Sequence, residues 1–176
     1  MTDRSLVNLG KTRSIDPYAP GADWVNSVMG EGTPVTAQHD VIRNSWLLDF
    51  SYATTPISPN GAHGNHHAHA KKVRAVRTVA ARTARLAGIS ELGRCRAQLT
   101  WYVLTNHRRD PVNLTLTLKA MVDGLVDAGV TTDDTPDLVD TPMPVIVRVD
   151  PMRNGTAWME LEVTRWAGLA QQLDID

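Results

Sequence analysis

The pattern of apolar and polar positions divides the chain near residue 44 and predicts six secondary-structure elements beyond it. Short runs of bulky or alternating apolar residues predict strands, and apolar residues spaced three and four apart predict amphipathic helices closed by glycine. The expected strands are 45–52, 97–105, 144–150 and 157–163, and the expected helices are 70–86 and 114–126. This order predicts an α/β domain with a mixed sheet of about four strands and two main helices.

The remaining segments are interpreted from local signals. Residues 1–43 mix Gly, Pro, Ser, Thr and Asp without a lasting period, which predicts a loop-rich N-terminal extension ahead of a domain at 44–176. That extension is either a poorly ordered terminus or an arm that packs on a partner subunit. Asn154-Gly155 predicts a hairpin turn between the last two strands, and residues 166–173 are compatible with a short helix.

Composition excludes several classes of protein. Apolar residues make up 42% of the chain, too many for a wholly disordered protein. No apolar run is long enough for a membrane span, and the first residues lack the pattern of a secretory signal. The single cysteine, Cys95, cannot form an intrachain disulfide, which fits a reducing compartment. We therefore expect a cytoplasmic protein without a membrane partner.

Charge is segregated although the net charge is only −1. Residues 70–97 hold eight Lys or Arg and one acid, whereas residues 131–140 hold four Asp and no base. In the first predicted helix the bases include Lys71, Lys72, Arg74 and Arg77. They form either a solvated face or a face that contacts phosphates, and no acid lies at the helical spacing that would offset their repulsion.

Candidate chemistry follows the predicted strands and helices. Asp110 comes just after a strand, and Asp133 and Asp134 come one helix later. Carboxylates from separate loops are ligands that a hard cation such as Mg²⁺ takes, although surface Asp pairs also occur in solvated loops. Lys119 lies on the helix between them, with Asp123 four residues on. This pair predicts either an intrahelical salt bridge or a cation placed against a phosphate.

Taken in order, these residues resemble a known family. The pattern consists of Arg108-Arg109-Asp110-Pro-Val-Asn113, Lys119, Asp123-Gly-Leu125, Ala128-Gly129 and Asp133-Asp134. It resembles the RusA family of Holliday-junction resolvases, the phage-type crossover junction endodeoxyribonucleases. The turn ISPN at 57–60 and the basic run at 70–77 extend the resemblance, which covers roughly residues 45–164.

The resemblance implies a fold, an activity and a set of roles. It implies a RusA-like domain that cuts branched DNA with Mg²⁺, or with Mn²⁺ in its place, in a bacterial or phage-infected cell. Asp110, Asp133 and Asp134 match the metal-binding acids, and Lys119 matches the catalytic lysine that acts with Asp110 and Asp134. Asn113 and Asp123 match positions that support the site.

Two positions depart from the family pattern. Val112 stands where the family has a second acid, and valine cannot bind a cation. The six residues from Asn113 to Lys119 exceed the family spacing by nearly one helical turn, so the lysine keeps its face. The sequence therefore leaves open a DNA-binding protein that lost catalysis with the acid at Val112. A metal-dependent phosphohydrolase of another kind would use the same acids but would leave the basic helix unexplained.

The expected partner is a four-way DNA junction. The expected DNA contacts are Lys71, Lys72, Arg74, Arg77, Arg108, Arg109, His66 and His67. A junction offers two equivalent strands, so a two-fold homodimer matches its symmetry. The histidines at 63–69 are expected in a loop, where they contact phosphate or base, bind zinc or serve no specific role; four ligands within seven residues make a closed zinc site awkward.

Overall fold

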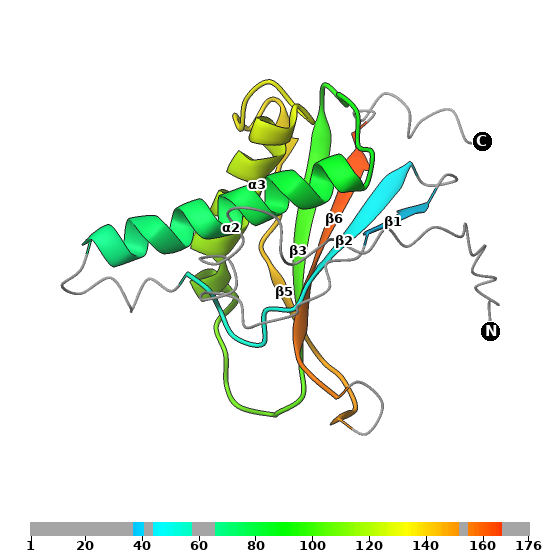
Figure 1. Cartoon of the computed structure of the whole chain (residues 1–176). Helices are drawn as coiled ribbons and strands as arrows, with labels where there is room; N and C mark the ends of the chain where they lie inside the picture. Colours follow the sequence, from blue (N-terminus) through cyan, green and yellow to red (C-terminus); the bar gives the residue numbers. More distant parts are fainter. Residues whose placement is uncertain (1–36, 41–43, 58–65, 152–154, 167–176) are drawn as a thin grey trace, which may run out of the picture.

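A mixed six-stranded sheet with two helices on one face organises the described part of the chain (Figure 1). The computed structural model describes residues 37–40, 44–57, 66–151 and 155–166. The strands are β1 (Ala37–Asp40), β2 (Ser45–Phe50), β3 (Cys95–Val103), β4 (Val139–Asp140), β5 (Val145–Arg148) and β6 (Trp158–Arg165). The helices are α2 (His66–Leu86), the short 3₁₀ helix η2 (Pro111–Leu114) and α3 (Thr115–Ala128). The structure thus confirms the predicted α/β class and the mixed sheet.

β3 lies at the centre of the strand pairing. The sheet order is β1-β2-β6-β3, with β4 and β5 both on the far side of β3. β3 runs antiparallel to β6 and parallel to β4 and β5. A parallel pair needs a long crossover connection, and α3 lies in the connection between β3 and β5.

The predicted hairpin between the last two strands is wrong. β3 lies between β5 and β6, so these strands do not pair with each other. β6 pairs with β3 over the register from Cys95↔Arg165 to Tyr102↔Trp158, and with β2 on its other side. The Asn154-Gly155 signal describes a local turn and does not determine which strand the chain joins after it.

The sheet buries one face under the helices. Along β3, alternate side chains such as Ala97, Leu99 and Val103 are buried, and those between them are partly or fully exposed. The buried set packs with Val76 of α2 and Met121 of α3 in a single core. The period of two in the strands and the spacing of three and four in the helices therefore meet in one apolar layer.

A glycine allows the two helices to approach closely. A Cβ placed on Gly124 of α3 would lie 2.5 Å from the carbonyl oxygen of Arg77 and 2.7 Å from the Cβ of Ala80, both on α2. Gly129, predicted to end this helix, has φ of 79° and donates its N–H to carbonyls of the last turn. The first glycine sets the spacing of α2 and α3, and the second ends α3 in the left-handed conformation.

The boundaries of the predicted elements shift by a few residues, and two strands are additional. β1 and β4, four and two residues long, had no periodic signal. α2 begins at His66, so the prediction that His66 and His67 lie in a loop is wrong; alanines alternate with the histidines there and favour helix.

His63, the extension before residue 37 and the expected helix after Trp166 lie outside the described residues. No described helix has both the length and the apolar character required to cross a membrane.

Candidate functional site

Three of the predicted site residues meet at one place. The Lys119 ammonium on α3 donates a hydrogen bond to Asp123 Oδ1 at 2.6 Å and another to Asp134 Oδ2. Asp123 lies one turn further along the same helix, whereas Asp134 belongs to the loop that follows α3. The intrahelical salt bridge predicted from the spacing is therefore present, and a second carboxylate distant in sequence joins it.

The loop after α3 is tied down locally. The Thr131 hydroxyl lies 3.2 Å from the carbonyl oxygens of both Gly93 and Asp133 and donates its single proton between them. The N–H of Asp134 in turn donates to Asp133 Oδ1 at 2.8 Å. These bonds support the backbone that carries Asp134 toward α3, while the Asp133 side chain remains at the exposed surface.

Opposite charges stabilise one another in this cluster. Hydrogen bonds to Asp123 and then Asp134 raise the pKa of Lys119, and the Lys119 ammonium holds the pKa of Asp134 below its usual range. Lys119 and Asp134 are therefore both ionised near neutral pH. The Lys119 side chain is 59% exposed, so its charge remains accessible to a ligand from solvent. An exposed ammonium held between two carboxylates can offset developing charge on a phosphate.

Asp110 has a different local role. It is the N-cap of η2, and its side chain accepts the N–H of Val112 at 3.0 Å. It forms no hydrogen bond or ion pair with Lys119 or Asp134, all three being described residues. Asn113, expected to support the site, donates its N–H to the Asp110 carbonyl oxygen at 3.1 Å. The structure thus joins Lys119, Asp123 and Asp134 and leaves Asp110 outside their network.

The carboxylates of this site are chemically suitable ligands for a hard cation, but their positions are less suitable. Carboxylate oxygens are suitable Mg²⁺ ligands. Across the described ranges, however, no three His, Cys, Asp or Glu side chains form a group able to hold a metal ion. Two carboxylates converge, and they converge on the Lys119 ammonium. Of the expected metal ligands, Asp134 is bonded to Lys119, and one oxygen of Asp133 accepts the N–H of Asp134.

The basic face of α2 is partly neutralised. Arg77 forms a bidentate ion pair with Asp127 of α3, with distances of 2.5 and 2.6 Å from its Nε and Nη2. Arg85 donates to the Asp127 carbonyl oxygen. Asp127 was missed from the sequence, although it lies four residues after Asp123 and therefore on the same side of α3. Arg77 thus links α2 to α3, whatever it contacts in a ligand.

Other predicted DNA contacts remain open to solvent. The side chains of Lys71, Lys72 and Arg74 are exposed and form no ion pair within the described part of the chain. His66 and His67 are exposed in the first turn of the same helix. These residues extend the positive surface toward the N-terminal end of α2.

Arg109 is fastened within the loop that follows β3. Its guanidinium donates to the Thr105 carbonyl and hydroxyl oxygens at 2.9 and 2.7 Å and to the His107 carbonyl oxygen at 3.0 Å. The same group lies 5.1 Å from the centre of the Trp101 ring, within cation–π range. Arg108 is fully exposed beside it. Of the two arginines predicted to contact DNA, one mainly shapes the loop and the other faces solvent.

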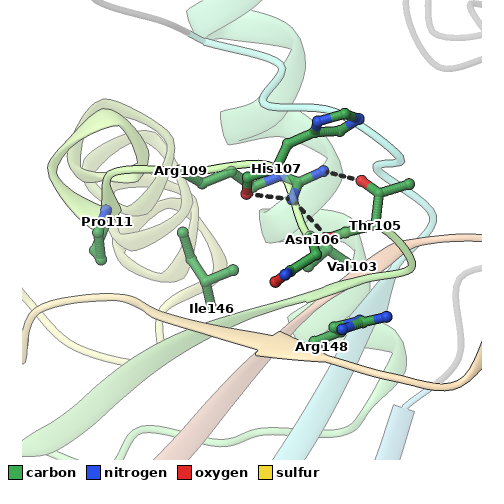
Figure 2. A pocket seen from close by; sticks show the side chains of 8 residues that line it. All are labelled: Val103, Thr105, Asn106, His107, Arg109, Pro111, Ile146 and Arg148. Atoms are coloured by element: carbon green, nitrogen blue, oxygen red, sulfur yellow. Dashed lines mark hydrogen bonds between the residues drawn. The ribbon is translucent and has the colours of Figure 1, made fainter.

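A pocket of about 350 Å³ lies beside this loop (Figure 2). Its walls come from the end of β3, the loop and β5, and include Val103, Asn106, Arg109, Ile146 and Arg148. Neither Asn106 nor Arg148 was expected from the sequence to belong to a site. The sequence feature that could have indicated them is their position at the ends of neighbouring strands, where ligands of open α/β sheets commonly bind.

Comparison with protein-family models finds no match, and comparison with curated proteins finds none either.

Proposed function

We propose that this protein is a metal-dependent endonuclease that acts on branched DNA, with the four-way junction as its substrate. The observation that carries the proposal is the contact between Lys119 and Asp134, fifteen residues apart in sequence. The RusA resemblance pairs these two residues as catalytic groups, and it also includes Asp123, the other partner of the lysine. A contact of this range is not imposed by helical spacing, so it supports a shared role.

Each charged group then has a place in the reaction. Lys119, whose side chain is 59% exposed, would offset charge that develops on the scissile phosphate once a bound metal ion takes up the negative charge of Asp134. Asp134 and Asp123 keep that lysine ionised and orient its ammonium group. Asp133 and Asp134 would hold Mg²⁺, which when bound neutralises phosphate charge and activates water.

Recognition of DNA rests on charge and shape. Lys71, Lys72 and Arg74 are exposed cations on one helix, and exposed cations bind the phosphate backbone of any sequence. A two-fold dimer would bring two such helices and two catalytic clusters to one junction, which matches the symmetry of the substrate.

A second function, junction binding without cleavage, has its own support. Asp110 caps η2 and Val112 is exposed, so the family's first and second acids add no carboxylate to the Lys119 cluster. A protein with this surface would keep its affinity for DNA while lacking a complete set of metal ligands.

A junction cleavage assay separates these functions. The purified chain is incubated with a labelled synthetic four-way junction with and without Mg²⁺, beside the variants Asp134→Asn and Asp137→Asn. Asp137 is the matched control because it lies in the same loop, is exposed, and is not among the partners of Lys119, which are Asp123 and Asp134. Cleavage by wild type and Asp137→Asn but not by Asp134→Asn supports the endonuclease. Junction bound but uncut under all conditions supports the second function, and absence of binding refutes both.

A further inference from the structure

The pocket beside the 104–110 loop has the composition of a nucleotide site. It lies where the parallel strands β3 and β5 end together: the N–H of Val149 donates to the Val103 carbonyl oxygen at 2.9 Å just past both strand ends. Ligands of open α/β sheets bind in such positions, outside the carboxyl ends of the strands. None of the residues that line the pocket belongs to α2 or α3.

Its walls divide into an apolar part and a cationic part. Pro111 and Ile146 present apolar surface, whereas Arg109 and Arg148 carry positive charge. No Asp or Glu is among the lining residues, all of which belong to the described ranges. A positive pocket with an apolar wall suits a ligand that has both a negative group and a flat apolar body.

The two arginines differ in what they can still bind. The Arg109 guanidinium is half-buried and donates its hydrogen bonds to Thr105 and His107 within the loop, so it acts as a fixed positive charge. The Arg148 side chain is exposed and forms no hydrogen bond or ion pair within the described part of the chain. Ile146 and Arg148 are two residues apart on β5 and therefore project to the same side (Figure 2). Arg148 is thus the group able to bind an anion beside the apolar wall.

The Asn106 side chain adds an amide that can pair with the polar edge of a nucleobase. Its amide carries donors and an acceptor, and Figure 2 shows the side chain directed between Ile146 and Arg148. It forms no side-chain hydrogen bond within the described residues. An amide of this kind pairs with the polar edge of a nucleobase, while a phosphate pairs with an arginine.

We propose that this pocket binds one unpaired nucleotide, its base against Pro111 and Ile146 with the edge on Asn106, and its phosphate on Arg148. The volume of about 350 Å³ lies at the lower end of the range for small-ligand pockets and suits a single nucleotide, not a duplex. The inference deepens the proposed function, since strands near a branch point supply unpaired nucleotides. A free mononucleotide has the same chemistry and is the other source.

Fluorescence anisotropy with single strands tests the pocket apart from cleavage. The probes are a labelled oligothymidylate and a labelled strand of equal length made of abasic residues, and thymidine 5′-monophosphate serves as competitor. The variants are Arg148→Gln and Asn106→Ala. Arg96→Gln is the charge control because it removes one exposed cation, 3.6 Å from Asp140, at the opposite end of β3.

The pocket predicts a specific pattern of affinities. Arg148→Gln weakens binding to both strands about tenfold and lowers the salt slope by about 0.7, the value for one lost phosphate contact on a single strand. Asn106→Ala weakens only the oligothymidylate, and Arg96→Gln leaves both affinities unchanged. Competition by the mononucleotide at low concentration identifies the free nucleotide as the ligand, and lack of competition identifies the strand.

Three results would overturn the pocket. The first is equal binding of abasic and base-containing strands by wild type. The second is an unchanged affinity and salt slope in Arg148→Gln. The third is a loss of affinity in Arg96→Gln as large as that in Arg148→Gln. All three variants change exposed side chains, so a thermal melt is expected to show intact folding. Because the probes contain no junction, a protein that fails to cut junctions can still pass this test, and a failed pocket leaves the endonuclease proposal standing.

Discussion

Replacing Gly124 with alanine should destabilise the protein, although alanine is the better helix former. In an exposed helix interior the change would stabilise by about 0.8–1 kcal/mol. Here the new Cβ would lie 2.5 Å from the Arg77 carbonyl oxygen and 3.0 Å from the Ala81 nitrogen, whereas ordinary contacts begin at 3.4 Å. The closest contact is therefore about 0.9 Å too short, and both atoms belong to the backbone of α2.

A backbone cannot rotate aside as a side chain can, so the helices must separate. Overpacking costs typically about 1–3 kcal/mol, and the two backbone contacts put this change in the upper half of that range, about 2–3 kcal/mol, which exceeds the gain in helix propensity. We expect a net loss of roughly 1–2 kcal/mol in the free energy of unfolding and a fall in Tm of about 2–8 °C for a chain of this size. The double variant Gly124→Ala with Ala80→Gly should remain destabilised. It removes the Ala80 Cβ, but the contact with the Arg77 carbonyl oxygen remains.

Urea denaturation followed by circular dichroism measures this effect. Thr78→Ala is the control, since Thr78 is exposed on α2 and the change should stay within about 0.5 kcal/mol of wild type. A Gly124→Ala variant as stable as wild type, or more stable, would show that the helices are not in contact at this point.

The remaining predictions concern charge, the missing acid and the cysteine. Arg74→Ala should weaken junction binding and lower its salt slope by about 0.9, whereas Arg77→Ala should change binding less, because Asp127 already neutralises Arg77; equal effects in a salt titration would contradict this. Arg77 holds the pKa of Asp127 below its usual range, so Asp127→Asn should lower Tm at neutral pH and not in strong acid, where the carboxyl is protonated in both folded and unfolded chains. Val112 is 52% exposed, so Val112→Asp should leave Tm unchanged and, if the missing acid weakens metal binding, raise cleavage at low Mg²⁺; a large fall in Tm would refute the exposure argument. Burial raises the pKa of the Cys95 thiol to about 11, so a thiol reagent should modify it only after denaturant is added, and rapid labelling of the folded protein would exclude its burial.

The sequence by itself determined the elements with a sustained period. β3 alternates over nine residues, and α2 and α3 repeat apolar residues at helical spacing, so local burial requirements alone are sufficient to predict them. The bond between Lys119 and Asp123 was predictable for the same reason, because four residues along a helix bring two side chains together. The end of α3 at Gly129 also follows from one local conformation.

Only the tertiary structure decided the pairings between distant segments. The separation of β5 from β6 by β3, the contact of Lys119 with Asp134 and the ion pair of Arg77 with Asp127 all join residues from different elements. No short pattern encodes them, because they depend on which strands pair and on how closely two helices approach. The role of Asp110 has a local cause instead: its carboxylate caps η2 by accepting the N–H of Val112, which lies only two residues away.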